Sequence, residues 1–463
     1  MADRLELELN RDLVLLGTRD WPLDRQPVHW PRMQLGAVAE LLTGFPFKSE
    51  EYTVDHEAPR LLRGDNVAQG TLRWSGAKRW APSATAVDSE YWLREGDVVV
   101  AMDRPWIAAG LKYARVGRSD VPALLVQRVA RLRGTKRLNT RFLYYVIGSR
   151  DFIQYVTSVQ TGTAVPHISA RQIKDFTFCL PPLSEQGAIA YVLGTLDDKI
   201  ELNRRMNEML EATARALFKS WFVDFEPVRA KTAGRNMGLP HHVAVLFPGQ
   251  FNDEGLPMGW RLSEIGREVR VVGGATPSTK EPAFWDGGEH HWATPKDLSG
   301  LQSPVLLDTD RKLTDAGVNK ISSGLLPVGT VLMSSRAPIG YLAIAGVPTA
   351  VNQGFIAMIC EGLLPNVFVL FWCEQQLDYI KGISGGSTFA EISKRAFRPA
   401  PVVIPSAEVL LAYSSVVGPI FDRLVANARE AISLAKTRDL LLPKLISGEL
   451  RVPDAERIAG AVI

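Results

Sequence analysis

The chain has 463 residues, of which 46% are hydrophobic and 22% charged. This composition is that of a folded protein and excludes disorder as the main state, and the length suggests about three domains. Lys and Arg number 53 against 50 Asp and Glu, a formal net charge of +3. Because so small a surplus does not make the whole chain a polyanion binder, any nucleic-acid site must be local.

The cysteine content and the N-terminus indicate the cellular compartment. The three cysteines include no C-x-x-C pair, which argues against a disulfide framework and against a cysteine zinc site. The N-terminus, MADRLELELNRD, is charged where a signal peptide is apolar, and no run of 18 apolar residues occurs. We expect a cytoplasmic protein that neither is secreted nor spans a membrane.

An internal repeat organises the chain. Residues 162–217 align without a gap onto residues 386–441, at an offset of 224, so that Asn203 matches Asn427. Upstream the match is looser, and there we align Gly44 with Gly274 and Arg104 with Arg336. Insertions and deletions of this kind are tolerated by loops, so each copy is predicted to be a variable globular domain followed by a rigid helix.

Two globular domains are predicted, over residues 30–182 and 259–405. Gly, Pro, Asn or Asp interrupts both every 8 to 12 residues, which favours short strands. Residues 97–102 and 329–333 are predicted to be buried strands, and residues 140–155 and 367–380 single packed helices. Each domain is therefore expected to be a mixed α/β globule.

Two long helices are predicted to follow the domains, over residues 183–225 and 406–450. A seven-residue repeat predicts their seam, formed in the first helix by Ile189, Leu196, Asn203, Leu210 and Leu217 and in the second by Ile420, Asn427, Leu434 and Leu441. Two seams of matching period predict an antiparallel coiled coil within the chain. Asn203 and Asn427 then fix its register, although they could instead be solvated positions on a surface helix.

The remaining segments complete the predicted architecture. Residues 1–29 form an N-terminal extension, residues 226–258 a linker and residues 451–463 a C-terminal tail. Ser184 and Ser406 are placed to cap the long helices, and Pro443 with Gly448 to end the second. The fold class is α+β, with two tandem mixed α/β domains separated by an antiparallel coiled coil, as a pseudo-two-fold internal repeat.

Catalytic motifs are missing from the sequence. It has no G-x-x-x-x-G-K-[ST], no H-E-x-x-H, no G-x-S-x-G and no amino-methyltransferase tetrapeptide. The pairs His241-His242 and His290-His291 lack a third ligand at a fixed spacing, so no metal site is predicted. We expect a chain without a catalytic site, a metal or a cofactor of its own.

The basic residues point to a polyanion. Between residues 32 and 175, Lys and Arg number 21 against 14 Asp and Glu, whereas residues 259–405 hold 13 of each. The crowded cations are candidates for phosphate contacts: Arg128, Arg131, Arg133, Lys136 and Arg137. Four further residues are candidates for reading bases, with a structural role as the alternative for each: Arg104, Gln127, Arg336 and Gln353.

Several segments resemble the DNA-specificity (S) subunit of type I restriction-modification systems. They are LPPLSEQ at 180–186, LDDKIELN at 196–203, LFKSWFVDF at 217–225, SRAPIGY at 335–341, NQGF at 352–355 and LLPKLISGEL at 441–450. The resemblance covers about residues 30–452. It implies two target-recognition domains, each reading one half of a bipartite site in double-stranded DNA, held by the coiled coil.

The resemblance also implies partners. Two methyltransferase (modification) subunits and a restriction subunit would dock on the helical seam regions. These partners would bring the S-adenosylmethionine, ATP and Mg sites, and the target adenine would be flipped into the partner's pocket. The Glu-Gln of the first helix start, at 185–186, is lost in the second repeat, which weakens the expectation of a partner contact at the start of the second helix.

Two other classes of function remain open. One is an enzyme, a nuclease or methyltransferase with unrecognised motifs. The other is a coiled-coil adaptor that binds only protein, or a regulatory DNA-binding protein without restriction partners. Under the specificity-subunit interpretation, lengthening both helices by one turn, about 5.4 Å, should lengthen the recognised spacer by about one or two base pairs.

Overall fold

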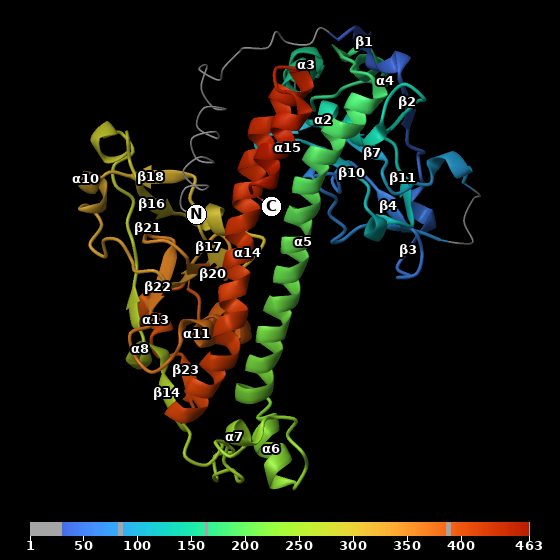
Figure 1. Cartoon of the computed structure of the whole chain (residues 1–463). Coiled ribbons are helices and arrows are strands. Elements are labelled where there is room, and N and C mark those ends of the chain that lie inside the picture. The colour runs from blue at the N-terminus through green and yellow to red at the C-terminus, as the bar shows by residue number, and fades with distance from the viewer. Residues whose placement is uncertain (1–29, 82–86, 163–164, 386–389, 463) are drawn as a thin grey trace. The chain divides into compact units, whose positions relative to one another are not determined.

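The computed structural model describes residues 30–81, 87–162, 165–385 and 390–462 (Figure 1). The predicted extension 1–29 and parts of both repeat copies, 163–164 and 386–389, lie outside the described residues. The chain divides into two compact units. Unit 1 comprises residues 1–199 and 433–463, and unit 2 comprises residues 200–432.

The domain of unit 1 contains two main sheets. The five-stranded sheet has the order β2 (Ala39–Thr43), β12 (Val129–Gly134), β7 (Val98–Ala101), β10 (Tyr113–Arg115) and β5 (Gln69–Gly70). The four-stranded sheet has the order β11 (Ala123–Leu125), β4 (Arg60–Leu62), β6 (Arg79–Trp80) and β3 (Tyr52–Thr53). Two short pairs complete it, β1 (Arg32–Gln34) with β13 (Thr177–Cys179) and β8 (Trp106–Ile107) with β9 (Gly110–Leu111).

The domain of unit 2 repeats this topology. Its five-stranded sheet has the order β15 (Arg270–Val272), β22 (Phe355–Ile359), β19 (Val331–Ser334), β20 (Leu342–Ala345) and β17 (Val305–Leu306). A three-stranded sheet has the order β18 (Arg311–Leu313), β16 (His290–Ala293) and β21 (Thr349–Val351), and β14 (Arg261–Glu264) pairs with β23 (Pro401–Ile404). In both domains the last strand of the five-stranded sheet is added in parallel, β5 to β10 and β17 to β20. The predicted repeat is therefore also a repeat of strand order.

Short helices cover the sheets. Unit 1 has α2 (Thr140–Ile147), α3 (Arg150–Val159), α4 (Ala170–Asp175) and, after the last long helix, α15 (Val452–Gly460). Unit 2 has α8 (Ile265–Glu268), α9 (Pro295–Ser299), α10 (Asp315–Val318), α11 (Asn366–Gln375), α12 (Leu377–Gly382) and α13 (Lys394–Phe397). The strands predicted at 97–102 and 329–333 are β7 and β19, and their side chains are fully buried.

The predicted single helices at 140–155 and 367–380 are wrong, because each is two helices. Gly148 and Ser149 separate α2 from α3, and the Ser149 hydroxyl accepts a hydrogen bond from the Phe152 N–H as the cap of α3. A side chain at position 148 would meet the Tyr113 hydroxyl, which explains the glycine. In unit 2, Gln376 is both the C-cap of α11 and the N-cap of α12.

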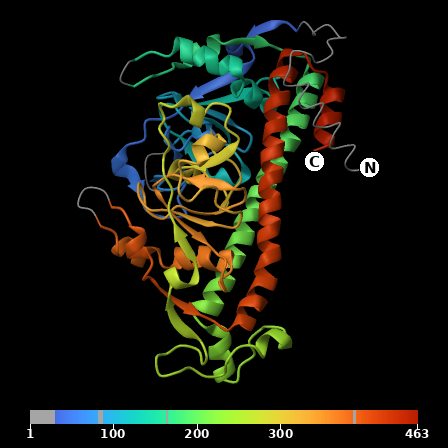
Figure 2. The ribbon, with the colours of Figure 1, turned by 90° about the vertical axis from the view of Figure 1, so that its left-hand side faces the viewer.

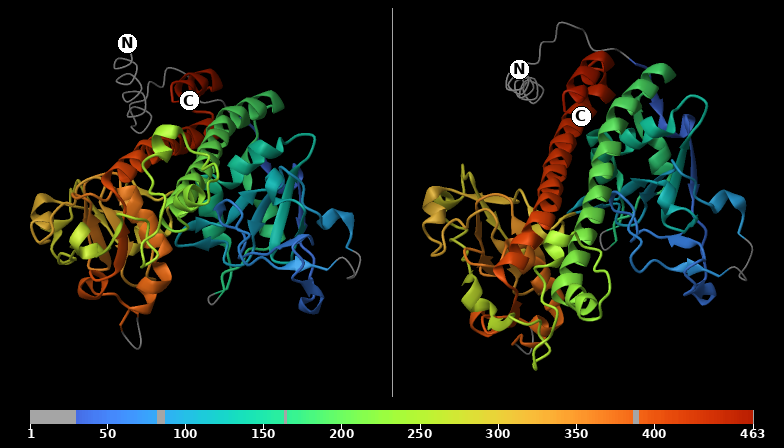
Figure 3. Two further views of the ribbon diagram at one scale, coloured as in Figure 1. Left: turned by 90° about the horizontal axis from the view of Figure 1, so that it is seen from below. Right: turned by 60° about the horizontal axis from the view of Figure 1, so that its bottom comes forward.

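The long helices are α5 (Leu183–Phe222) and α14 (Ala407–Ser447). In unit 2 they run antiparallel, because Asn203 contacts Glu430 whereas Asn207 contacts Leu424, further back along α14 (Figure 3). All nine seam residues are buried or packed in the core, which confirms the heptad prediction: Ile189, Leu196, Asn203, Leu434, Leu441 and Asn427 are buried, and Leu210, Leu217 and Ile420 pack against the unit 2 core.

The ends of the long helices differ from prediction. Ser406 caps α14, its hydroxyl accepting from the Val409 N–H at 3.4 Å, but Ser184 lies inside the first turn of α5 and caps nothing. Pro443 does not end α14, which continues to Ser447 because Leu441 and Leu445 on either side are completely buried. A proline costs one helical hydrogen bond, which this packing offsets.

The segment 226–258 is more than a linker. It contains α6 (Glu226–Thr232) and α7 (His241–Ala244), which lie at the C-terminal end of α5 (Figure 2). The Phe247 ring meets the Trp221 ring edge-on at 5.0 Å and is almost completely buried. The segment therefore belongs to the core of unit 2.

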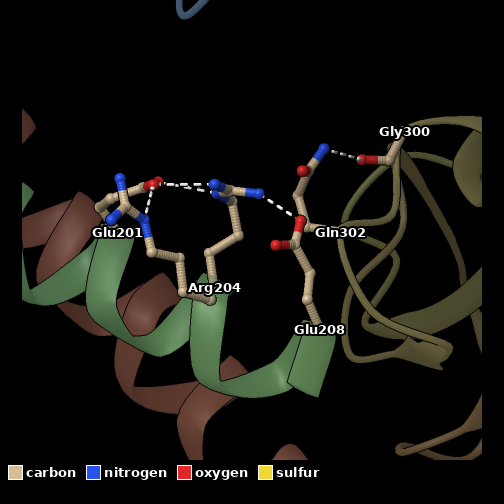
Figure 4. Close-up of polar contacts among 6 residues, drawn as sticks. Glu201, Arg204, Glu208, Gly300 and Gln302 are labelled. Carbon is tan, nitrogen blue, oxygen red and sulfur yellow. Dashed lines mark hydrogen bonds and ion pairs between the residues drawn. The ribbon is translucent and has the colours of Figure 1, made fainter. Parts of the chain in front are cut away.

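The outer face of α5 in unit 2 is charged. Arg204 donates to both carboxylate oxygens of Glu201 at 2.7 Å and also pairs with Glu208, and Arg205 adds a third bond to Glu201 (Figure 4). These bonds lower the pKa of Glu201.

Of the described helices, α14 is long and apolar enough to cross a membrane. This is weak evidence for a membrane span, because a packed helix of a soluble protein passes the same test.

Candidate nucleic-acid interface

Three chain segments meet at one edge of the unit 1 domain, and we call this place the first edge. The segments are 102–104, 127–128 and 166–168. The Met102 N–H donates to the Arg128 carbonyl at 2.8 Å, and the Met102 carbonyl accepts from the Ile168 N–H at 2.9 Å. The Arg104 N–H donates to the Pro166 carbonyl at 2.7 Å. Two of these three backbone bonds join residues that are more than 60 positions apart.

The first edge presents polar side chains on a strained backbone. Arg104 has φ 44° and Arg128 has φ 70°, a left-handed region that residues other than glycine rarely occupy. Both are exposed, as is Gln127. Backbone strain of this kind clusters at functional sites, where the surrounding structure holds it in place. The strain and exposure together make the first edge the strongest candidate for contact with a ligand in this domain.

Charges also gather at the first edge. His167 Nδ1 lies 2.6 Å from Asp103 Oδ1, and Arg128 donates to the same oxygen at 3.3 Å. Burial lowers the pKa of Lys112, and the charges of Asp65 and Arg104 act on that amine. Arginine and lysine suit phosphate contacts, and arginine, glutamine and carboxylates can read base edges.

The unit 2 domain forms an equivalent second edge from segments 335–337, 353–354 and 391–392. The Ser335 N–H donates to the Gly354 carbonyl at 2.8 Å, and the Ser335 carbonyl accepts from the Ile392 N–H at 3.0 Å. Ala337 has φ 55°. Gln353 is exposed, and its side-chain oxygen accepts from the Thr276 hydroxyl at 2.6 Å.

The register of the two edges corrects the sequence alignment of Arg104 with Arg336. Met102 and Ser335 make the same two backbone bonds, so Asp103 matches Arg336 and Arg104 matches Ala337. The positive φ values agree, since they fall on Arg104 and Ala337. The two arginines therefore occupy neighbouring, not identical, positions. Sequence alignment missed this because the intervening loops differ in length.

The basic cluster predicted between Arg128 and Arg137 is not one patch. Arg128 precedes β12, whereas Lys136 and Arg137 follow it and are exposed beyond the other end of a six-residue strand, about 20 Å away. Arg131 is only 5% exposed and donates to the Glu90 carbonyl at 2.6 Å. Burial lowers its pKa.

Arg133 is also used inside the domain. Its guanidinium bonds both carboxylate oxygens of Asp97, at 2.5 and 2.8 Å. Arg131 and Arg133 are alternate residues of a central strand, where side-chain direction is set by the sheet. Both therefore stabilise the domain, and the structure argues against them as phosphate contacts.

The seam residues and Gln186 cannot themselves form a docking surface. Seam side chains are packed between helices, as described above. Gln186, in the Glu-Gln expected to contact a partner, is 1% exposed: its oxygen accepts from the Asn139 N–H at 2.8 Å and its amide donates to the Arg137 and Pro181 carbonyls. It joins the domain of unit 1 to the start of α5.

Four residues of the edges were not predicted from the sequence: Asp103, His167, Thr276 and Glu391. These residue types form no motif, and each is brought to its edge only by contacts with a segment distant in the sequence.

Within the described residues no group of three or more His, Cys, Asp or Glu side chains could hold a metal ion. His290 and His291 instead pair with different aspartates, Asp315 and Asp308.

Comparisons with known proteins give the family. The model of the type I restriction modification DNA specificity domain matches residues 27–212 and 257–410. The chain is 26% identical to the HindI specificity subunit of Haemophilus influenzae over 67% of its length and 77% of that protein. It is 37% identical to the MjaIX specificity subunit of Methanocaldococcus jannaschii, over 38% of its length and 40% of that protein.

A solved structure has the same fold. The S subunit of a type I restriction-modification system from M. genitalium superposes with a TM-score of 0.54 at 14% identity, covering 91% of this chain and 97% of that one. Two family matches in tandem agree with the repeated topology of the two domains. The chain belongs to the DNA-specificity subunits of type I restriction-modification systems, and its role is DNA sequence specificity.

Proposed function

We propose that the two domains each read one half of a bipartite site in duplex DNA, with the first edge and the second edge as the reading surfaces. The observation that carries this proposal is the repetition of one edge geometry in both domains. Each edge joins three distant segments and presents exposed polar side chains, among them Gln127 and Gln353. Two copies of one reading surface suit a site with two parts.

The chain would act as a scaffold without a catalytic site of its own. Two methyltransferase subunits and a restriction subunit would bind it and supply the S-adenosylmethionine, ATP and Mg sites. The family's role in specificity supports this division of labour. The chain would act in the cytoplasm together with these partners. The purified chain alone is then expected neither to methylate nor to cleave DNA.

The test is to co-express the chain with its methyltransferase subunit in a host free of DNA methylation and to map modified bases across the genome. The expected result is a split motif with a fixed gap, methylated once in each half on opposite strands. A continuous motif would contradict the two-edge proposal. Methylation or cleavage by the purified chain alone would contradict the assignment of catalysis to the partners.

The number of methyltransferase subunits that bind the chain can be measured separately. Mass measurement of the purified complex by light scattering should give two methyltransferase subunits for each specificity chain. One methyltransferase subunit per chain in an active complex would contradict this stoichiometry.

A further inference from the structure

The two edges carry a pair of one acidic and one basic side chain at equivalent positions, in opposite order. In the first edge the anion Asp103 lies on segment 102–104, and its partner His167 lies on segment 166–168, with an isolated backbone bridge between them. In the second edge the cation Arg336 occupies the position of Asp103, and the anion Glu391 occupies that of His167, with the same bridge. The backbone bridge is shared, and the acidic and basic side chains are exchanged.

The neighbouring position differs as well. Arg128 donates to Asp103 at 3.3 Å, whereas the equivalent residue of the second edge is Gly354, which has no side chain. Asp103 is therefore contacted by two basic side chains and Arg336 by one carboxylate. This difference is not explained by the fold, because the backbone hydrogen bonds of the two edges are the same.

These pairs are weak enough to be exchanged for a ligand. The Arg336 and Glu391 atoms are 3.6 Å apart, and their side chains are 38% and 49% exposed. The Asp103 and His167 side chains are 34% and 29% exposed. Ion pairs with this exposure contribute about 1 kcal/mol or less. A partner that offers better hydrogen-bond geometry can therefore displace either member.

The chemistry of the two positions selects different bases. An arginine bonds the O6 and N7 atoms of guanine through two parallel bonds, whereas a carboxylate accepts from the N4 amino group of cytosine. We propose that this one position determines specificity in each half-site, with Arg336 reading a guanine through the second edge and Asp103 reading a cytosine amino group through the first. This inference rests on the proposed function.

The surroundings fit these roles. A carboxylate near DNA is repelled by phosphate unless cations offset its charge, and Arg128 contacts Asp103 while Arg104 and Lys112 lie nearby. Glu391 lies 3.6 Å from the Arg336 guanidinium, so it keeps an opposite charge beside the arginine without a tight hydrogen bond that DNA would have to break. Both edges thus place a polar partner beside their reader in the free protein.

The experiment is methylome mapping of Arg336→Ala and Asp103→Asn in the full chain, co-expressed with its methyltransferase subunit. Each variant should lose discrimination at one base pair of one half-site, by about fivefold to 150-fold, and leave the other half unchanged. The two variants should affect opposite halves, the first a guanine and the second a cytosine. Arg267→Ala is the matched control, because Arg267 forms an exposed ion pair with Glu264 elsewhere in the unit 2 domain.

Each outcome separates the inference from the proposed function. If the unmodified chain gives no split motif, the proposed function fails. If it gives one and Arg336→Ala leaves the motif unchanged, or weakens modification equally at all sites, base reading by Arg336 is overturned. Should Arg336→Ala fail to fold, Arg336→Lys keeps the charge but loses the two parallel bonds, and an unchanged motif with that variant overturns the inference equally.

Discussion

Asp197 of α5 and Arg438 of α14 form an ion pair at 2.7 Å in unit 1, and the Tyr145 hydroxyl of α2 donates to the second oxygen of the same carboxylate at 2.6 Å. The Arg438 and Asp197 side chains are 28% and 23% exposed. Three elements of unit 1 therefore meet at one carboxylate, and we call this triad the polar anchor.

Unit 2 has an apolar counterpart of the polar anchor. By the repeat offset of 224, Phe421 stands in place of Asp197 and Ala214 in place of Arg438. The short helices α2 and α11 begin at an offset of 226, which puts Phe371 of α11 where α2 has Tyr145. All three are buried in the core of unit 2. The two domains are thus fixed to their helices by different chemistry, which disfavours docking of one domain at the site of the other, because it would bury a charge without a partner.

The first prediction concerns the polar anchor. Asp197→Ala should lower the free energy of unfolding by about 1–3 kcal/mol, because Arg438 and Tyr145 lose their partner in a largely buried place. Chemical denaturation of the full chain measures the change. Asp439→Ala is the control, since Asp439 also bonds Arg438 but is 64% exposed, and it should change stability by less than about 0.5 kcal/mol. Equal losses in both variants would contradict the anchor.

The second prediction concerns the asparagines of the seam. The side-chain amide of Asn427 donates to the side-chain oxygen of Asn207 at 2.9 Å. The side-chain amide of Asn207 donates to the backbone carbonyl of Leu424 at 3.1 Å. Asn427→Leu should destabilise the chain by about 1–2 kcal/mol, because a buried oxygen loses its donor. The double variant with Asn207→Leu removes both polar groups and should regain that loss. Unfolding midpoints in urea measure the stability of both variants. A double variant as unstable as Asn427→Leu would show that the unpaired Asn207 oxygen is not the cause of the loss.

The third prediction concerns a glycine at the base of the second edge. A methyl group at Gly274 would lie 1.6 Å from the Val351 carbonyl oxygen, and one at the equivalent Gly44 would lie 2.2 Å from the Val126 carbonyl oxygen. Gly274→Ala should therefore destabilise the chain by about 3 kcal/mol or more, because backbone must move. Gly300→Ala is the control, since nothing lies within 4 Å of that site. Thermal unfolding compares the two, and a native-like midpoint for Gly274→Ala would refute the close contact.

The fourth prediction separates two arginines that are close in sequence. Arg128→Ala should weaken DNA binding and reduce the slope of log affinity against log salt by about one, because an exposed cation is lost. Arg131→Ala should instead lower stability, because this buried side chain holds the Glu90 carbonyl. Titration of the complex with a 30-base-pair duplex at several KCl concentrations measures the slope. If folded Arg131→Ala also reduced the slope of log affinity against log salt, Arg131 would be a DNA contact and this prediction would be wrong.

The sequence by itself determined the repeat, the two long helices and their seam. Leu196, Asn203 and Leu434 are predicted by a seven-residue period, which a helix converts directly into one buried face. The family segments likewise lie in contiguous stretches, and the strands of β7 and β19 follow from short apolar runs. These features depend on neighbours in the chain, so they can be read in chain order.

Only the tertiary structure decided which polar residues are available for binding. Arg131 and Arg128 are three positions apart, yet β12 buries one while a left-handed turn exposes the other. The match of Asp103 with Arg336 depends on hydrogen bonds to Arg128 and Gly354, across loops of unequal length. Such pairings join segments distant in sequence, and their register is set by the sheet and its packing, which no local pattern of residues encodes.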